Sequence, residues 1–395
     1  MRIILIVVYY LPSPKSCAAL VQDLADELLN QGHEVTVVTT DENLSCSSKY
    51  SIESGIEVLR IKTNKIDGAN KYSRFINEFL LSWLIWYRGK KYFKSISCDL
   101  VVWYSPSIFF GELIKKLRKL YRCKSYLILR DLFPQWAVDT GLLKRGGIYK
   151  MLHYYEKFQY RQADVIGVQS PNNIQYFELM NLSDGLNLEV LYNWINVDKI
   201  PKSTNYYRRK YNLLEKVVFF YGGNIGIAQD IKNIVRLANR LSSIPLAHIL
   251  LVGDGSEVDN LKKIINDLGL RNISVYGSVS QDEYHSMLSE FDIGLISLDR
   301  NFKTSNFPGK MLGYMKCSMP ILASVNFGND LINLIEDNQI GLACLNGDDD
   351  LFFNNALKLV HSPELRIAYG TRGNELLMSL FSAQSAARTI LSHFK

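Results

Sequence analysis

The sequence predicts an α/β protein with two parallel sheets in tandem. Short apolar, β-rich runs alternate with longer helical stretches, and each run ends at a cluster of Gly, Pro, Ser or Asp. This alternation is typical of βαβ units around a parallel sheet. The chain has 395 residues, which is too long for one small core and suggests two domains, since a domain usually takes roughly 100–200 residues.

The strands fall into two series. We expect those of the first series at residues 2–9, 34–39, 57–62, 99–103, 125–130, 164–168 and 188–191, with an amphipathic helix at 18–31. The second series is expected at 216–221, 247–252, 273–276, 293–297, 321–323 and 341–344. The polar segment 193–212 between them is interpreted as an interdomain linker. A last helix at about 382–394 has no strand after it, and we expect it to pack back on the first domain.

Composition excludes several classes of protein. Hydrophobic residues make up 47% and charged residues 21%, so neither a disordered chain nor a multi-span membrane protein fits. The formal net charge of +6 does not imply nucleic-acid binding. The 6 cysteines are scattered without metal-ligand spacing, which favours free thiols in the cytosol. Pro12 and Pro14 interrupt the apolar start, which we interpret as a buried strand and not a signal peptide.

Two glycine-rich turns follow neighbouring strands of the second series. Gly223, Asn224 and Gly226 lie in the first turn, and the second spans 253–255. Glycine lets a backbone approach a ligand, and a following helix offers unpaired N–H groups that suit a pyrophosphate. Either turn alone is equally compatible with a plain strand-to-helix connection. Together they favour a ligand site, because open α/β sheets bind ligands at the carboxyl ends of their strands.

A lysine stands at an expected helix start. Pro308 can begin a helix, and Lys310 in its first turn would oppose the helix dipole. An anionic ligand would explain that placement, whereas the alternative is a solvated surface lysine.

In the first domain, Arg130 and Asp131 end a core strand, either as a functional pair or as a buried ion pair. The loop before the first helix contains Lys15, Ser16 and Cys17, which suit close approach of a ligand or tight packing.

Metal chemistry has little support in the sequence. The only DxD spacing, at 348–350, is typical of a helix N-cap, and the histidines form no ligand cluster, so we expect no metal.

An aromatic stretch at 75–87 is followed by cations at 88–94 and again at 115–124. About twelve apolar residues cannot span a bilayer, which needs about twenty. The segment either lies at a membrane surface or is a core helix with a solvated basic end.

Taken together, these residues resemble the glycosyltransferase family 4 pattern on a GT-B fold, over nearly the whole chain. The segment Arg-Asp-Leu-Phe-Pro at 130–134, with 137–138 and 141–143, is similar to the family's RDLWPxxAVxxGLL form. The other matching segments are 32–39, 163–166, 170–171, 193–198, 223–226, 252–255, 276–279 and 308–310.

The resemblance implies two Rossmann-like domains facing a central cleft, with a C-terminal helix that crosses back. Residues 1–198 with 380–395 would bind the acceptor, and residues 199–379 the nucleotide-sugar. It also implies sugar transfer with retained configuration and no metal or other cofactor. The likeness is greatest to bacterial O-antigen and capsule enzymes, including L-fucosaminyl (N-acetyl-L-fucosamine) transferases that use UDP sugars. We expect a polyprenyl-diphosphate-linked saccharide as acceptor and a location at the inner face of the cytoplasmic membrane, with no nucleic-acid partner.

The resemblance also assigns roles to residues. Lys310 and the Gly226 loop would stabilise the departing diphosphate, Arg130 and Asp131 would orient donor sugar or acceptor, and Lys15, Ser16 and Cys17 would lie on the acceptor side. The expected donor contacts are Gly223, Asn224, Gly226, Gly253, Asp254, Gly255, Ser278, Val279, Ser305, Asn306, Pro308, Gly309 and Gly313.

The chain departs from the family pattern at five positions. Two glutamates eight residues apart correspond here to Ser305 and Gly313, and an Arg and a Lys that hold the diphosphate correspond to Asn224 and Gln229. A histidine of the first domain corresponds to Arg130. Charge neutralisation would then fall to Lys310, to backbone amides, and to Arg300 or Lys303. These departures mark a subfamily or a weakened enzyme, and the alternatives are a nucleotide-sugar epimerase and an inactive membrane-surface scaffold.

Overall fold

A computed structural model describes residues 1–66, 70–105, 107–139, 141–180, 182–197, 202–301 and 307–394. The chain divides into two compact units, Met1–Ile195 with Ala383–Lys395, and Asn196–Ser382. Unit 1 therefore ends at Ile195, whereas the sequence places the boundary after residue 198. Trp194, directly before this division, is buried in the core of unit 1 and donates its indole N–H to the Leu20 carbonyl at 2.8 Å.

The described residues of unit 1 form an eight-stranded sheet with the order β3-β4-β2-β1-β5-β6-β7-β8. Only β3 runs antiparallel to its neighbour in this part of the chain. The strands are β1 (Arg2–Ile6), β2 (Glu34–Asp41), β3 (Ser48–Glu53), β4 (Ile56–Lys62), β5 (Leu100–Tyr104), β6 (Lys124–Ile128), β7 (Val165–Val168) and β8 (Leu188–Val190). The sequence missed β3 because this edge strand is partly exposed along its whole length and carries no apolar run.

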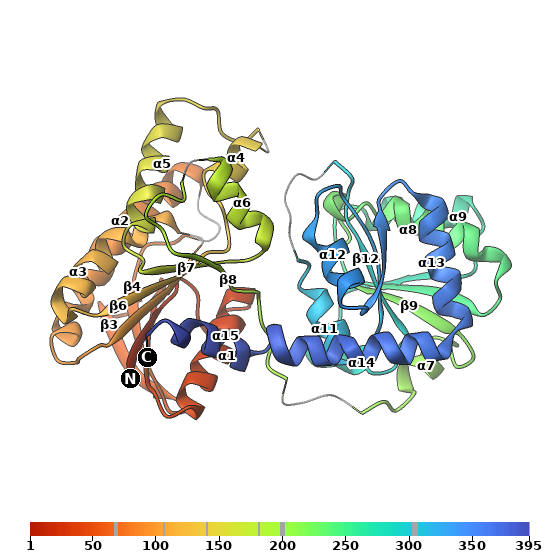
Figure 1. Cartoon of the computed structure of the whole chain (residues 1–395), viewed down its shortest axis with the longest axis horizontal. Helices are drawn as coiled ribbons and strands as arrows, with labels where there is room; N and C mark the ends of the chain where they lie inside the picture. Colours follow the sequence, from red (N-terminus) through yellow and green to blue (C-terminus); the bar gives the residue numbers. More distant parts are fainter. Residues whose placement is uncertain are drawn as a thin grey trace. The chain divides into compact units, whose positions relative to one another are not determined.

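Helices cover both faces of this sheet. They are α1 (Ser16–Asn30), α2 (Lys71–Phe93), α3 (Gly111–Tyr121), α4 (Gln135–Asp139), α5 (Gly147–Tyr160), α6 (Pro171–Leu179) and α15 (Ala383–Ser392), with the 3-10 turn η1 (Ile108–Phe110). Alternate residues of β1 supply the two cores: Ile3 and Leu5 pack with α1 and α15, whereas Ile4 and Ile6 pack with α2 and α3. The last helix lies beside α1, as expected (Figure 1).

The aromatic segment after residue 70 forms α2, which has one buried side and one exposed side. Leu81 and Ile85 are buried in the core, whereas Trp83 and Tyr87 on the other side are 54% and 82% exposed. Within the described residues, no helix combines the length and the apolar character that crossing a bilayer requires.

The described residues of unit 2 form a six-stranded parallel sheet with the order β11-β10-β9-β12-β13-β14. The strands are β9 (Val217–Gly222), β10 (Ala247–Val252), β11 (Ile273–Tyr276), β12 (Ile293–Ser297), β13 (Ile321–Val325) and β14 (Gly341–Leu345). Each lies within two residues of its expected position. The helices are α7 (Tyr206–Lys210), α8 (Ile231–Arg240), α9 (Val258–Asp267), α10 (Gln281–Leu288), α11 (Lys310–Lys316), α12 (Asp330–Asp337), α13 (Asp349–His361) and α14 (Pro363–Leu380), with the 3-10 turns η2 (Ile227–Gln229) and η3 (Leu241–Ser243).

The acidic run at 348–350 starts a helix, as its position predicts. Asp348 caps α13 by accepting from the Leu351 N–H at 3.0 Å. Asp349 and Asp350 each pair with an arginine of α8, Arg236 at 2.8 Å and Arg240 at 2.7 Å. Since these carboxylates serve a cap and two ion pairs, the run holds two helices of unit 2 together.

The predicted linker at 193–212 is too long at both ends. At its start Trp194 packs in the core of unit 1, and near its end α7 belongs to unit 2. The Glu290 side chain, 4% exposed, accepts from the backbone N–H groups of Tyr206 at 2.9 Å, Tyr207 at 2.8 Å and Arg208 at 3.2 Å. Arg208 also pairs with Asp292 at 2.6 Å. One carboxylate thus satisfies the N-terminal donors of α7 and fixes the start of unit 2.

These contacts shift the pKa of Glu290. Burial alone would raise it, but the hydrogen bonds from Thr204 and from the backbone of residues 206–208 outweigh burial and hold the pKa below its ordinary value of 4.5. Since the folded state then binds the proton less readily than the unfolded state, the resulting stabilisation is complete above about pH 4.5. It is lost as the pH falls through the folded-state pKa.

We predict that Glu290→Gln lowers the free energy of unfolding by about 1–3 kcal/mol at pH 7, because a charged acceptor of several N–H groups is replaced by a neutral one. Urea denaturation followed by circular dichroism measures this, with Glu215→Gln on the exposed surface as the matched control. The difference from the unsubstituted protein should shrink below pH 4. Equal stability at pH 7 would contradict the anchoring role.

Candidate functional site

The candidate site lies at the carboxyl ends of three neighbouring strands of unit 2. The loop 223–226 follows β9, the loop 253–255 follows β10, and Ser278 follows β11. In an open parallel sheet this edge is where ligands bind. The structure therefore places both glycine turns and Ser278 together, as expected from the strand order.

The two glycine loops interlock backbone to backbone. The Ile225 N–H donates to the Asp254 carbonyl at 2.8 Å, and the Glu257 N–H donates to the Ile225 carbonyl at 3.0 Å. A Cβ on Gly253 would lie 1.8 Å from the Gly223 oxygen, and one on Gly255 would lie 2.2 Å from the Ile225 oxygen. Glycine at 253 and 255 is thus required by the close approach of the two loops.

The interlocking leaves alternate donors of the first loop unused. The Gly223 N–H bonds to the Val252 carbonyl at 2.9 Å, and the Ile225 N–H is used as described. The N–H groups of Asn224 and Gly226 have no hydrogen-bond partner in the part of the chain that the structure describes. Gly223 has a φ of +123°, which favours glycine. Two backbone donors are therefore available to an anion at this loop.

Lys310 lies directly against the same loop. Its side chain is half-buried at the start of α11, and its Nζ is 3.3 Å from the centroid of the Tyr221 ring. A Cβ on Gly223 would be 3.8 Å from this Nζ. Desolvation lowers the Lys310 pKa well below its ordinary value, and no charged group of the described residues acts on it. The Lys310 nitrogen thus lies desolvated on an aromatic face and is not a solvated surface group.

Tyrosines that the sequence did not single out support this arrangement. The buried Tyr221 donates its hydroxyl hydrogen to the Asn224 carbonyl at 2.6 Å, which fixes the loop. The face of its ring contacts the Lys310 nitrogen. The buried Tyr314 hydroxyl accepts from the Gly222 N–H at 3.4 Å and donates to the Leu295 carbonyl at 3.2 Å. The position of Tyr221 directly before two glycines was the signal available in the sequence.

Two further residues that the sequence predicts as donor contacts, Asn224 and Ser278, are hydrogen-bonded to other side chains. Asn224 donates to Gln229 at 3.0 Å, so these two amides satisfy each other beside Gly226. Ser278 donates to Asp254 at 3.0 Å, which links the loops after β10 and β11.

The remaining predicted donor contacts are spread around α11 and β11. Pro308 and Gly309 precede Lys310, and Val279 is half-buried after β11. Gly313 faces the interior, since a Cβ there would lie 2.9 Å from Leu288. Ser305, Asn306 and Lys303 lie outside the described residues.

In unit 1 the predicted pair separates into two different environments. Arg130 donates through Nη1 to the Leu191 carbonyl at 2.8 Å and stacks 5.5 Å from the Trp194 ring centroid. Burial lowers the pKa of Arg130. Asp131 is exposed, although the atoms crowded around it raise its carboxyl pKa. Arg130 thus ties the end of β6 to the chain after β8, and Asp131 is the member that faces solvent.

The loop before α1 shows a similar division. Lys15 and Ser16 are exposed, and the Lys15 Nζ lies 5.8 Å from the Tyr9 ring centroid. Cys17 is buried in the core of unit 1, and burial raises its thiol pKa. A direct contact with a ligand is therefore open to Lys15 and Ser16, whereas Cys17 packs.

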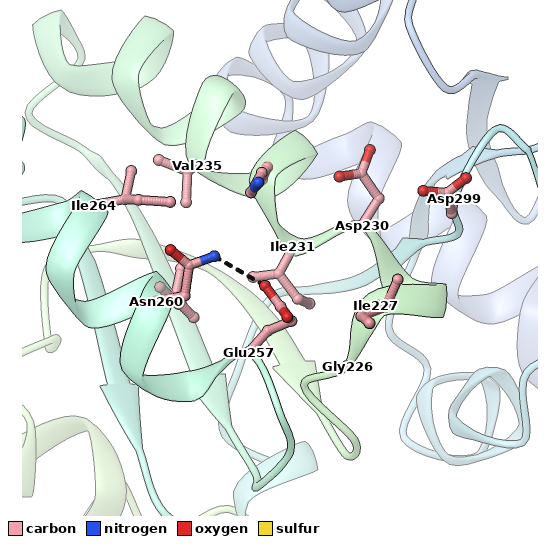
Figure 2. Close-up of a pocket in the computed structure, with 11 residues that line it drawn as sticks. Gly226, Ile227, Asp230, Ile231, Val235, Glu257, Asn260, Ile264 and Asp299 are labelled. Carbon is pink, nitrogen blue, oxygen red and sulfur yellow. Dashed lines mark hydrogen bonds between the residues drawn. The ribbon is translucent and has the colours of Figure 1, made fainter.

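Unit 2 also contains a pocket of about 220 Å³ beside the Gly226 loop, which the sequence did not reveal (Figure 2). It lies between the starts of α8 and α9. Ile231 and Ile264 line it, and the Asn260 amide donates to Glu257 at 2.9 Å (Figure 2). Among the described residues, no group of three His, Cys, Asp or Glu side chains could hold a metal ion.

The comparisons with known proteins show what unit 2 resembles. Residues 204–376 match the family model described as glycosyl transferases group 1. This match covers most of unit 2 and less than half of the chain. The matched range covers the glycine loops, Lys310 and the whole sheet of unit 2.

Two relatives match more of the chain. WbjE of Pseudomonas aeruginosa, described as a glycosyltransferase, is 27% identical over 232 residues, which are 58% of this chain and 58% of WbjE. This aligned region therefore spans little more than half of that relative. WcaI of Escherichia coli, described as a colanic acid biosynthesis glycosyl transferase, is 23% identical over 336 residues, which are 79% of this chain and 80% of WcaI.

Solved structures show the fold of both units together. Sucrose-phosphate synthase from Thermosynechococcus elongatus matches 100% of this chain and 98% of its own, with a TM-score of 0.72 and 17% identity. HepE from Anabaena, solved in complex with UDP, matches 100% of this chain and 99% of its own, with a TM-score of 0.68 and 14% identity. The fold is GT-B, and the expected fold class is confirmed.

We predict that Gly253→Ala destabilises the protein by about 1–3 kcal/mol, because the new methyl group must push the two loops apart. Thermal unfolding monitored by circular dichroism measures the change. Gly277→Ala is the matched control, since nothing lies within 4 Å of a Cβ at that position. Equal unfolding temperatures for the two variants would show that the loops separate without cost.

Proposed function

We propose that this protein is a glycosyltransferase whose nucleotide-sugar donor binds at the carboxyl edge of the unit 2 sheet. The observation that carries the proposal is Lys310, whose desolvated nitrogen lies on the Tyr221 ring without a carboxylate partner among the described residues. Burying such a charge is unfavourable unless an anion joins it. A nucleoside diphosphate supplies that anion.

The Gly223–Gly226 loop completes the anion site. The unpaired N–H groups of Asn224 and Gly226 and the Lys310 ammonium would hold the diphosphate as it departs from the sugar. Donors fixed in a partly desolvated place stabilise developing charge without reorganising, which is the largest contribution in many enzymes. The paired amides of Asn224 and Gln229 add no charge, and the Lys310 side chain lies in contact range of Gly223.

The proposed nucleotide is UDP. HepE, which shares the fold at 14% identity, was solved with UDP, and this supports the choice. We further propose an amino sugar such as N-acetyl-L-fucosamine, transferred with retained configuration and without a metal. The resemblance of the sequence to family 4 transferases supports these points, and Lys310 would take the place of a metal at the phosphates.

The proposed acceptor is a saccharide on a polyprenyl diphosphate carrier, in the biosynthesis of an O-antigen or capsule. The description of WcaI as a colanic acid biosynthesis enzyme supports a polysaccharide pathway. The exposed Trp83 and Tyr87 and the nearby lysines of α3 support a position at the inner face of the cytoplasmic membrane. Asp131, which faces solvent at the end of the β6 segment, would orient the acceptor hydroxyl.

A panel of nucleotides tests the donor site. We predict that UDP raises the unfolding temperature more than GDP or ADP, and that a chelator leaves this shift unchanged. Binding to the folded state alone stabilises it by about 2.7 kcal/mol at a ligand concentration of 100 Kd. Thermal shift and calorimetry give the measurement. If no nucleotide stabilises the protein, the result contradicts the transferase and supports the inactive scaffold. Conversion of a UDP-sugar in the absence of an acceptor would support the epimerase.

A substitution tests the role of the lysine. We predict that Lys310→Met weakens UDP binding at least tenfold and slows sugar transfer by about 10²–10³, the effect of losing one fixed donor to an oxyanion. Because burial disfavours the ammonium, the variant should unfold at the same or a higher temperature than the original protein. Calorimetry and a UDP-release assay are the measurements, and Lys263→Met on the exposed side of α9 is the control. Near-normal affinity and turnover would remove Lys310 from the mechanism.

A further inference from the structure

Unit 1 contains a groove lined by aromatic side chains. Its volume is about 400 Å³, and it lies between α2, the η1 turn with the start of α3, and α5. Three rings in mutual edge contact form its floor: Phe79 and Phe109 have centroids 5.6 Å apart, and Tyr155 lies 5.4 Å from Phe79 and 5.5 Å from Phe109. Such a volume falls within the usual range of ligand pockets, roughly 300–1,000 Å³.

The walls of the groove are large aromatic side chains that remain open to solvent. Trp83 of α2 is 54% exposed and Tyr154 of α5 is 64% exposed. Exposed aromatic side chains that line a concave site are typical of a place where a ligand binds. The groove is therefore shaped and apolar enough to accept a hydrocarbon.

Two lysines of α3 lie over the rings that line the groove. The Lys116 Nζ is 3.7 Å from the Trp83 ring centroid, and the Lys115 Nζ is 5.7 Å from the Phe158 ring centroid. Glu112, one turn earlier in α3, also lines the groove, so the three side chains leave one positive charge in excess. Ammonium groups at an aromatic wall suit an apolar chain that ends in a phosphate.

The floor of the groove is continuous with the segment that ends β6. Phe109 belongs to a small apolar cluster in which Phe133 also packs. Phe133 stands two positions after Asp131 in the chain, within the segment 130–134 that resembles the family motif. Phe133 therefore links the floor of the groove to the chain segment that contains Asp131.

We propose that this groove binds the isoprenoid chain of a polyprenyl-phosphate-linked acceptor, with Lys115 and Lys116 facing its phosphates. The inference rests on the proposed function and assigns the lipid part of the substrate to a site in unit 1. Flat, branched isoprene units pack against aromatic faces and edges, and a concave site selects one chain from the many of a bilayer. The alternative is that these side chains contact the lipids of the membrane without selecting an isoprenoid chain. A comparison of isoprenoid and linear phosphates distinguishes the two.

Farnesyl phosphate, used below its micellar concentration, is the probe. The full chain should bind it with a blue shift of tryptophan fluorescence from Trp83, should bind farnesol about tenfold more weakly, and should not respond to inorganic phosphate. Dodecyl phosphate, which has the same charge on a linear chain, should bind at least fivefold more weakly than farnesyl phosphate. Equal binding of the two phosphates would overturn the isoprenoid assignment in favour of general membrane contact, and no binding of either would overturn the groove as a lipid site.

Paired variants locate the binding. Tyr154→Ala and Lys116→Gln should each weaken farnesyl phosphate binding at least fivefold. Their controls, Tyr206→Ala on α7 and Lys263→Gln on α9, are exposed positions of unit 2 outside the groove and should change it less than twofold. Equal losses in a variant and its control would overturn the assignment. Because UDP binding is measured on the same samples, loss of the donor site and loss of the groove give different results.

Discussion

The contact of the Gly223 and Ile225 carbonyls with Gly253 and Gly255 is the constraint on which the candidate site depends. Two backbones meet there at distances that exclude any side chain. The contact fixes which N–H groups of the first loop are used by the protein and which are left over. The first loop also lies against the Lys310 side chain. The pattern of used and unpaired donors therefore follows from one steric condition at the ends of β9 and β10.

The sequence predicted the frame of the molecule well, because buried parallel strands are continuous apolar runs that local pattern reveals. It failed where the pattern was weak or the partner was distant. The edge strand β3 has polar, partly exposed residues, and α7 is held by Glu290, which is more than 80 positions later in the chain. Neither the strand β3 nor the anchoring of α7 produces a local pattern in the sequence.

For the candidate site, residue type was easier to predict than role. Gly253 and Gly255 were expected to face a ligand, and the structure shows that the neighbouring loop requires them. Arg130 was expected to orient a substrate, and its guanidinium is bonded to the chain that follows β8. Lys310 lies beside the glycine loop, but the ring beneath it could not be foreseen, because Tyr221 reaches it only through the packing of β9 against α11.

Because α15 belongs to unit 1, the ribosome finishes unit 2 before it finishes unit 1. Unit 1 is formed by the first 195 residues together with the last helix, so its face over α1 is uncovered until the C-terminus has been made. During synthesis, unit 2 has all of its residues before unit 1 does. A growing chain therefore carries an incomplete first unit throughout the synthesis of the second, and Ala386, Ala387 and Ile390 are the side chains that finally cover it.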